Sequence, residues 1–408
     1  MKTLAVLVAL GAIITPLLVS YIFGGWMAVY VSPEYTFNHI PDQSGKFAIV
    51  TGGNTGIGKV TVRELARKGA KVVLTSRSVS KGENAKKDIC NVIGSACNNI
   101  EVQPLDLASL ESVLHFTDTI KTMTDRIDIL ILNAGVMMCP YGETKDGYEL
   151  QFGTNHLGHF FLVDQLMTEL LESSARVVTV SSAAHQGSYP GGIRFDQLDN
   201  NNNYNLILAY GQSKLANILF AQELAERTKG SGMTSNAIHP GMVKTDLMRH
   251  VTDLVEYMGG DVMIQIKDWA MNMLAMDTDP GAYTQLYVAT APEMAKVTGK
   301  YYVPIALEGQ PSSDTRNRTL QQELWRVSSD LVSRFMEPRL KAEEVALASK
   351  LESEAQSIAR AKLQAEAAEK RRIEEERIQK QYEEEARSLA EQEAASKENS
   401  EEKIESSE

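Results

Sequence analysis

The sequence predicts a doubly wound α/β fold built on a parallel sheet of about seven strands. Short apolar segments alternate with amphipathic segments of helix length between residues 45 and 336. Several of the apolar segments, such as residues 47–50 and 72–75, are hydrophobic at almost every position rather than at every second one, which is typical of strands covered on both faces. The chain has 408 residues, enough to form one large core and leave further segments at both ends.

The predicted strands follow one another at intervals that leave room for helices. Seven segments qualify as strands: residues 47–50, 72–75, 100–104, 127–132, 176–181, 235–239 and 300–303. Amphipathic helices are predicted between several of them, at residues 60–68, 107–122 and 158–172. Strands that alternate with helices indicate parallel βαβ units, in which ligands bind outside the carboxyl ends of the strands.

The segment after the first predicted strand is rich in glycine. Residues 51–58 read Thr-Gly-Gly-Asn-Thr-Gly-Ile-Gly, and a helix-like segment follows them directly. Such a turn lets the backbone approach a pyrophosphate, whose charge then lies at the helix N-terminus. This pattern predicts a Rossmann-type dinucleotide site.

A second motif supplies chemistry for that dinucleotide. Tyr210 and Lys214 are four residues apart, so on a helix they share a face. An ammonium beside a phenol favours the tyrosinate and is expected to lower the pKa of Tyr210. Tyr210 would then be an acid and base near neutral pH. Together the two motifs predict hydride exchange between a nicotinamide cofactor and a carbonyl group.

Further motifs follow the third to sixth predicted strands and complete a recognisable order. They are Leu105-Asp106-Leu107, Asn133-Ala134-Gly135, Ser181-Ser182 and Pro240-Gly241. This order resembles the short-chain dehydrogenase/reductase superfamily over roughly residues 45–334. Residues 133–140, 155–160 and 210–217 are most similar to the membrane-anchored retinol dehydrogenase group within it. The resemblance implies an oxidoreductase that acts on CH–OH or carbonyl groups.

The resemblance implies four catalytic residues. Tyr210 would protonate an alkoxide or deprotonate an alcohol, and Ser182 would hydrogen-bond to the carbonyl oxygen. Lys214 would lower the pKa of the tyrosine and hold the nicotinamide ribose. Asn155 would fix a water that connects Lys214 to solvent. Ser181 is the neighbouring candidate for the serine role, but the family assigns that role to the second serine of the pair.

The resemblance also implies a set of cofactor-binding residues. Asp106 would accept from the adenine amino group, Asn133 would support the turn beside the adenosine, and Thr245 would bond the amide or phosphate region. The full set is Gly52, Asn54, Thr55, Gly56, Ile57, Gly58, Arg77, Asp106, Leu107, Asn133, Ala134, Gly135, Tyr210, Lys214, Pro240, Gly241, Val243 and Thr245.

The end of the second predicted strand indicates which dinucleotide is used. An acidic residue there holds a ribose 2′-hydroxyl, whereas arginine suits a 2′-phosphate. Ser76 stands at the acidic position and Arg77 follows it, which favours NADP(H). Lys81 could add to a phosphate site or be a surface lysine. The alternative is that Arg77 only ends the strand in water and that NAD is used.

The N-terminal segment predicts a membrane anchor. Residues 4–31 are almost entirely apolar, which is long enough to span a hydrocarbon core of ~30 Å. The alternative is a cleaved signal peptide, but the apolar run is longer than such peptides need and no clear cleavage site ends it. We therefore expect an anchor over residues 1–31 and a linker over residues 32–44. The implied location is a membrane, the endoplasmic reticulum or alternatively lipid droplets.

The C-terminal segment differs in composition from the rest. Residues 341–408 contain 19 acidic and 12 basic residues. We expect the short-chain dehydrogenase domain over residues 45–336, a charged helix over residues 337–395 and a disordered tail over residues 396–408. Leu347, Leu351 and Ile358 begin a coiled-coil seam that charged residues interrupt. A solvated single helix and a dimerising or partner-binding helix both remain open.

Composition excludes several other classes. The net charge is −12, which does not suit nucleic-acid binding. Three cysteines at positions 90, 97 and 139 lack the spacing of a metal site or the number of a disulfide scaffold. His156, His159 and His185 likewise lack metal-ligand spacing, so no metal is predicted.

The substrate is predicted only by class. Residues 246–276 are apolar and rich in methionine, which suits a lid over an apolar substrate, although the same residues could pack on the sheet or touch the membrane. Retinoids, long-chain aldehydes and sterol ketones are the candidates. The segment between Ser182 and Tyr210 looks long for the family and is expected to alter the mouth of the substrate cleft. The alternative function is a dinucleotide-binding scaffold that recruits partners through the charged helix; a homodimer is also possible.

Overall fold

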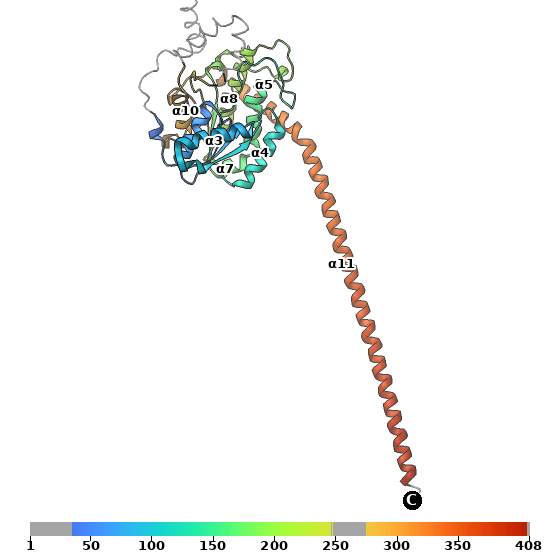
Figure 1. The fold of residues 1–408 in the computed structure, drawn as a ribbon. Helices are drawn as coiled ribbons and strands as arrows, with labels where there is room; N and C mark the ends of the chain where they lie inside the picture. Colours follow the sequence, from blue (N-terminus) through green and yellow to red (C-terminus); the bar gives the residue numbers. More distant parts are fainter. Residues whose placement is uncertain (1–34, 246, 248–274, 406–408) are drawn as a thin grey trace, which may run out of the picture. The chain divides into compact units, whose positions relative to one another are not determined.

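The computed structural model describes residues 35–245, 247 and 275–405 (Figure 1). The chain divides into two compact units, the first ending at Arg334 and the second beginning at Phe335. The predicted anchor over residues 1–31 lies outside the described residues, as do residues 248–274 of the predicted lid. Among the helices that are described, none is long and apolar enough to cross a membrane.

The first unit contains a sheet of eight strands. Their bounds are β1 Phe47–Val50, β2 Lys71–Ser76, β3 Ile100–Pro104, β4 Ile129–Leu132, β5 Arg176–Val180, β6 Thr234–Ile238, β7 Tyr301–Val303 and β8 Leu307–Glu308. The order across the sheet is β3-β2-β1-β4-β5-β6-β7-β8. The seven predicted strands are confirmed and run parallel, and the unpredicted two-residue β8 pairs antiparallel with β7.

The strand order changes direction at β1. This strand pairs with β2 on one side and with β4 on the other, so that Ala48 lies opposite both Val72 and Ile129. In a doubly wound sheet such a change leaves a crevice at the carboxyl ends of the two strands concerned. The glycine-rich turn follows β1 and the Asn133-Ala134-Gly135 motif follows β4, so both lie at this crevice.

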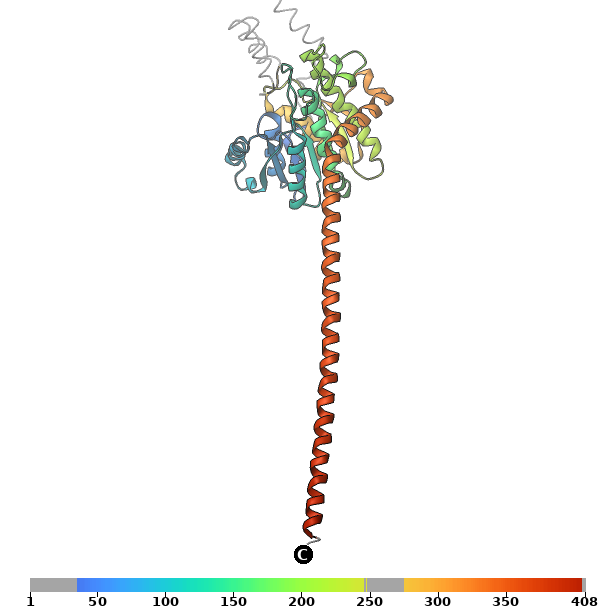
Figure 2. The same ribbon diagram turned by 90° about the vertical axis from the view of Figure 1, so that its right-hand side faces the viewer.

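Helices lie on both faces of the sheet (Figure 2). Their bounds are α2 Gly56–Arg67, α3 Val79–Ile93, α4 Leu110–Met123, α5 Leu150–Phe152, α6 Gly158–Gln165, α7 Met167–Glu172, α8 Leu206–Arg227 and α10 Thr278–Thr290. Helices α2 and α10 pack together with alternate residues of β1 and β2, including Ala48 and Val50, in one apolar core. The apolar strands are therefore buried by helices, which explains their lack of alternation.

The prediction of a linker over residues 32–44 is wrong for residues 35–44. Residues 35–44 pack on the first unit, with Tyr35 only 7% and Ile40 only 2% exposed. The ring of Phe37 meets that of Tyr283 edge to face at 4.7 Å, and the guanidinium of Arg63 lies 5.4 Å from the centre of the Phe37 ring. The prolines and polar residues of this segment suggested a linker, but its aromatic and aliphatic side chains are buried.

The charged helix is longer than predicted. Helix α11 runs from Arg318 to Glu405 without interruption, so it includes residues expected to belong to the domain and most of the predicted disordered tail. Its first part, up to Arg334, belongs to the first unit, where Leu324 and Val332 are buried. Pro338 lies inside the helix, where it removes one backbone donor. The ion pair between Glu337 and Lys341 spans this position at 2.7 Å.

Candidate active site

The glycine-rich turn has a backbone that other residues would not tolerate. Gly52 has a φ of +65° and Gly56 a φ of +55°, both in the left-handed region. A Cβ on Gly58 would lie 2.5 Å from the side-chain nitrogen of Asn133 and 2.5 Å from the carbonyl oxygen of Gly52. Because the turn leads directly into α2, its backbone N–H groups can face an anion.

The turn is joined to the segment after β4 by hydrogen bonds. The Thr51 hydroxyl oxygen accepts from the backbone N–H groups of Asn133 at 2.8 Å and of Ala134 at 3.0 Å. The Asn133 side-chain nitrogen donates to the Thr51 carbonyl at 2.8 Å, while its oxygen is buried without a hydrogen-bond partner among the described residues. Asn133 thus links the segments after β1 and β4 and keeps one acceptor free.

The segment after β6 folds over the same turn. A Cβ on Gly56 would lie 2.9 Å from the side chain of Thr245, so these two predicted cofactor residues are in contact distance. Val243 pairs with Met276 in an isolated parallel bridge and is 9% exposed. Gly241 has a φ of +91°, which lets the chain turn directly after Pro240.

Two predicted cofactor residues lie near the third strand. The Asp106 carboxylate accepts from the backbone N–H of Ala108 at 3.1 Å and lies 3.7 Å from the Lys145 ammonium. The adjacent Leu107 is buried, and a Cβ on Gly158 would lie 2.4 Å from the Leu107 carbonyl oxygen. This glycine therefore allows α6 to approach the end of β3 closely.

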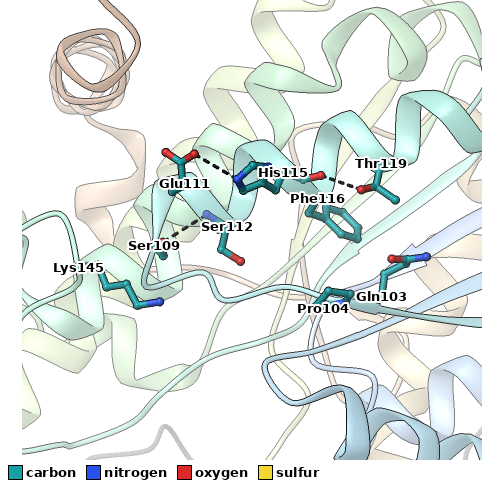
Figure 3. Close-up of a pocket in the computed structure, with 9 residues that line it drawn as sticks. All are labelled: Gln103, Pro104, Ser109, Glu111, Ser112, His115, Phe116, Thr119 and Lys145. Carbon is teal, nitrogen blue, oxygen red and sulfur yellow. Dashed lines mark hydrogen bonds and ion pairs between the residues drawn. The ribbon is translucent and has the colours of Figure 1, made fainter. Parts of the chain in front are cut away.

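A cavity of about 370 Å³ lies next to Asp106, between β3 and α4 (Figure 3). Lys145, Gln103 and His115 are among its lining residues, and His115 pairs with Glu111 at 3.3 Å. None of the four predicted catalytic residues lines this cavity. It therefore adjoins the predicted cofactor residue Asp106 rather than the predicted catalytic residues.

The end of the second strand presents a cation. Ser76, the last residue of β2, is buried, and its hydroxyl accepts from the backbone N–H of Ser78 at 3.3 Å. Arg77 is exposed, and its guanidinium makes no ion pair or hydrogen bond within the described part of the chain. No acidic residue stands at the end of β2, so the arrangement offers a positive charge beside the glycine-rich turn.

The structure brings three of the predicted catalytic residues together. Tyr210 and Lys214 lie on α8 and are each 3% exposed. The Ser182 side chain, just after β5, lies close enough to the Tyr210 phenol to lower its pKa. The Lys214 ammonium lies 5.7 Å from the centre of the Tyr210 ring and donates to the Val180 carbonyl at 3.0 Å.

The two neighbouring serines have different partners. The Ser181 hydroxyl donates to the backbone carbonyl of Lys214 at 2.7 Å and so joins the end of β5 to α8. The Ser182 hydroxyl accepts from the backbone N–H of Ala184 at 3.2 Å, and it also lowers the pKa of Tyr210. Of the two serines, only Ser182 therefore influences the acid strength of the tyrosine.

Burial changes the acid strengths of the pair on α8. It raises the pKa of Tyr210 to about 12, although the nearby Ser182 hydroxyl acts in the opposite direction. It also lowers the pKa of Lys214 to about 8. The expected lowering of the Tyr210 pKa by Lys214 is not seen, because the loss of water around the buried phenol raises this pKa and only Ser182 opposes that rise. Tyr210 is a protonated acid at neutral pH in this arrangement.

Asn155 occupies an irregular turn of helix. Residues Gly153–Leu157 form a π-helical turn, a feature frequent at functional sites. Its side chain bonds to the Val136 backbone N–H at 2.8 Å, the Val136 carbonyl at 2.9 Å and the Ser213 hydroxyl at 2.9 Å. A Cβ on Gly135 would lie 3.0 Å from the Asn155 side-chain oxygen and 3.5 Å from the Lys214 nitrogen. Asn155 thus lies beside Lys214, but its side chain is already occupied by protein partners.

The long segment between Ser182 and Tyr210 is tied to the segment after β4. The Tyr204 hydroxyl donates to the Cys139 carbonyl at 2.8 Å and accepts from the Gln151 side chain at 2.8 Å. Gln151 also accepts from the backbone N–H of Met138 at 2.8 Å. Two chain segments near the catalytic residues are therefore held by one buried network.

Sequence reasoning missed two histidines. His185 donates from Nδ1 to the Ser182 carbonyl at 2.6 Å and accepts at Nε2 from the backbone N–H of Ser312 at 3.0 Å. His159 contacts both Thr51 and Asn155. Both had been interpreted as ordinary residues because they lack metal-ligand spacing. The only signal of these contacts in the sequence is spacing. His185 is three residues after Ser182, and His159 is four residues after Asn155.

These residues fit a nicotinamide dinucleotide. Any residue other than glycine would place a side chain in the space of the glycine-rich turn. Among the described residues, the Asn133 side-chain oxygen has no hydrogen-bond partner, and the Lys214 ammonium donates only to the Val180 carbonyl. The arrangement can hold a pyrophosphate at α2 and place a carbonyl oxygen beside Ser182 and Tyr210. Such a site belongs to the dinucleotide-dependent oxidoreductases.

Comparisons with known proteins agree. The family model described as short chain dehydrogenase matches residues 46–195. The human protein "Retinol dehydrogenase 11" is 41% identical over 289 residues, which are 71% of this chain and 86% of the relative. The human protein "Retinol dehydrogenase 13" is 42% identical over 291 residues, or 71% of this chain and 85% of the relative.

Solved structures show the same fold. An uncharacterised protein from Mycobacterium paratuberculosis is 33% identical, with a TM-score of 0.55 over 73% of this chain and 97% of its own. An L-sorbose reductase from Gluconobacter frateurii, complexed with NADPH and L-sorbose, is 19% identical, with a TM-score of 0.52 over 64% of this chain and 95% of its own. The chain belongs to the short-chain dehydrogenase/reductase family, within the retinol dehydrogenase group, and is an oxidoreductase.

Proposed function

We propose that this protein transfers a hydride between NADP(H) and the carbonyl or alcohol group of an apolar substrate at a membrane. The observation that carries the proposal is the Ser182 hydroxyl close to the Tyr210 phenol, with Lys214 one helical turn away and the glycine-rich turn at the end of β1, which β4 separates from β5. Bound NADPH would supply the hydride. The remaining chemistry is the handling of one proton and one negative charge, which the protein's own residues supply.

Reduction follows from the protonation states. A carbonyl oxygen placed beside Ser182 and Tyr210 gains negative charge, which the Ser182 hydroxyl stabilises by donating a hydrogen bond. Tyr210 then gives its proton to that oxygen, a role that suits a phenol whose pKa burial raises to about 12. The protonated Lys214 stabilises the tyrosinate that remains. In the reverse reaction Tyr210 removes the proton of an alcohol.

Cofactor preference rests on the end of β2. Arg77 is exposed and uncommitted to other described residues, and Ser76 stands where an acid would hold a 2′-hydroxyl. A guanidinium binds a phosphate by charge-assisted hydrogen bonds, whereas it gains little from a neutral ribose. These features support NADP(H) over NAD.

The substrate class rests on composition and on relatives. Residues 4–31 have the length and apolarity of a membrane anchor, and an anchored enzyme can take its substrate from the bilayer. The two human relatives are named retinol dehydrogenases. We infer that the substrate is a retinoid, a long-chain aldehyde or a sterol ketone, and that the protein lies in the endoplasmic reticulum membrane.

The test is turnover by the full-length protein in detergent. NADPH oxidation is followed with retinal, long-chain aldehydes and sterol ketones, and NADH is run in parallel. Tyr210→Phe should abolish turnover and keep NADPH binding, because only the hydroxyl is removed. The matched control is Tyr141→Phe, in which an exposed phenol bonded to Glu143 is lost. Dinucleotide binding without turnover on any carbonyl would instead favour the scaffold alternative.

A further inference from the structure

His159 joins two parts of the candidate active site. It lies on α6, directly after the π-helical turn, and is 1% exposed. Its Nδ1 is 2.9 Å from the backbone carbonyl oxygen of Asn155, and its Nε2 is 2.9 Å from the hydroxyl oxygen of Thr51. Asn155 and Thr51 are 104 positions apart in the sequence, so this ring connects the π-helical turn that carries Asn155 to the glycine-rich turn.

The partners determine which ring nitrogen carries the proton. A carbonyl oxygen can only accept, so Nδ1 of His159 donates to Asn155. Burial lowers the pKa of His159 to about 4, and the ring is therefore neutral at pH 7. The Nε2 atom then has a lone pair, which accepts the Thr51 hydroxyl proton. The alternative acceptor for that proton, the Ile131 carbonyl, is more distant at 3.3 Å.

The same two partners hold the segment after β4 from opposite ends. Thr51 accepts from the backbone N–H groups of Asn133 and Ala134 at 2.8 and 3.0 Å. Asn155 bonds to the backbone N–H and carbonyl of Val136 at 2.8 and 2.9 Å. His159 closes this network, since it is the group that joins the Thr51 side to the Asn155 side.

We propose that His159 is a positioning residue. Its Nδ1–H bond to Asn155 and its Nε2 bond to Thr51 fix the position of the π-helical turn relative to the glycine-rich turn. The inference rests on the proposed function for its catalytic consequence. Loss of the Thr51 contact would loosen the turn that holds the dinucleotide. Loss of the Asn155 contact would loosen the π-helical turn beside Lys214.

Two conservative variants separate these contacts. In His159→Asn the amide nitrogen can replace Nδ1 and donate to Asn155, but the side chain is too short for Thr51. In His159→Gln the amide oxygen can replace Nε2 and accept from Thr51, while the donor to Asn155 is lost. His159→Phe keeps the ring and removes both contacts. The exposed His115, replaced by Asn, is the control.

The measurements are the NADPH dissociation constant and kcat with retinal, well below each variant's Tm. We expect the dissociation constant to rise on the order of tenfold in His159→Asn with kcat nearly kept. We expect kcat to fall on the order of tenfold in His159→Gln with NADPH binding nearly kept. His159→Phe should show both changes. Equal effects of the Asn and Gln variants, or no effect in any variant, would overturn the proposal.

A second measurement uses the wild-type protein, so it does not depend on whether the variants fold. In the wild-type protein, ¹H–¹⁵N correlation spectra of the histidine rings distinguish the two neutral tautomers. The Nδ1–H form is expected for His159, assigned by its absence from a folded variant at that position or by selective labelling. An Nε2–H form would refute the bridge. A wild-type protein with this tautomer that binds neither NADPH nor NADH would refute the proposed function and leave the bridge standing.

Discussion

The hydroxyl of Tyr35 lies 3.0 Å from that of Thr290, although 255 positions separate the two residues. The Tyr35 ring also meets Tyr287 edge to face at 5.2 Å. Tyr35 therefore belongs to the first unit, which carries the candidate active site, and packs against α10. The boundary between a removable N-terminal segment and the fold must lie before it.

Two N-terminal deletions test this boundary. Removal of residues 1–34 should release the protein from membranes and leave its Tm nearly unchanged. Removal of residues 1–41 should also release it but lower the Tm by several degrees, because the buried contacts of Tyr35, Phe37 and Ile40 are lost. Membrane flotation and thermal melts measure both effects. Equal melting temperatures would show that residues 35–41 do not stabilise the fold.

The C-terminal helix gives a second pair of truncations. Removal of residues 341–408 should leave cofactor binding and turnover nearly intact. Removal of residues 318–408 should prevent stable folding, because the buried Leu324 and Val332 are lost together with Trp325, whose ring stacks on Phe220 at 5.9 Å. Loss of one buried leucine side chain alone costs about 2 to 5 kcal/mol. A folded and active protein ending at residue 317 would contradict this.

Cofactor preference can be reversed at one position. Arg77→Asp should shift preference from NADPH towards NADH, since it removes a charge-assisted contact worth about 1.5 to 3 kcal/mol and adds a carboxylate that repels a 2′-phosphate. Initial rates with each dinucleotide give the ratio of kcat/KM values. Lys87→Asp makes the same charge change at an exposed position on α3 and should leave the ratio unchanged. A native enzyme that uses NADH equally well would contradict the assignment.

The pH dependence of reduction follows from Lys214. Its pKa is lowered to about 8 by burial, so the ammonium is present below that pH and lost above it. Tyr210 stays protonated throughout this range, since its pKa is raised to about 12. The kcat/KM for carbonyl reduction should therefore be level below about pH 8 and fall above it. The control is Lys300→Ala, which removes a partly exposed lysine that pairs with Glu308 and should leave the pH profile unchanged. Constant activity up to pH 10 would exclude a need for the Lys214 charge.

The tail can be tested as a helix by itself. In the second unit Leu347 is 58% and Ile358 is 70% exposed, and ion pairs such as Arg372 with Glu369 at 3.0 Å run along the helix surface. A peptide of residues 337–405 should show helicity that is independent of concentration and that falls with added salt. Helicity that rises with concentration, together with a dimeric mass in sedimentation, would establish a coiled coil instead.

Sequence reasoning predicted the sheet well because its signals are local. Several of the parallel strands are apolar runs, such as β1 and β4, and several of the motifs follow a strand end, as Asn133 and Ser182 do. Contacts between distant segments were not predictable in this way. Nothing near His159 indicates that Thr51, 108 positions away, is its partner. The pKa of Tyr210 was predicted in the wrong direction because burial depends on the packing of the whole unit.

Boundaries failed for a related reason. Prolines and polar residues in the segment 32–44 are typical of a linker, while the burial of Ile40 depends on elements that come later in the chain. The start of α11 at Arg318 was also missed, since residues 318–336 are less rich in helix-forming charges than those that follow.

The ion pairs of the second unit affect which insertions and deletions this helix can accept during evolution. Lys341 with Glu337, and Arg377 with Glu374, each form within one turn of the same helix. No register with another element has to be preserved for such pairs, unlike the pairs of a sheet or a coiled coil. Insertions and deletions in this segment should therefore be neutral for its helicity. Its length is free to drift, whereas the spacing of four residues between Tyr210 and Lys214 on α8 is not.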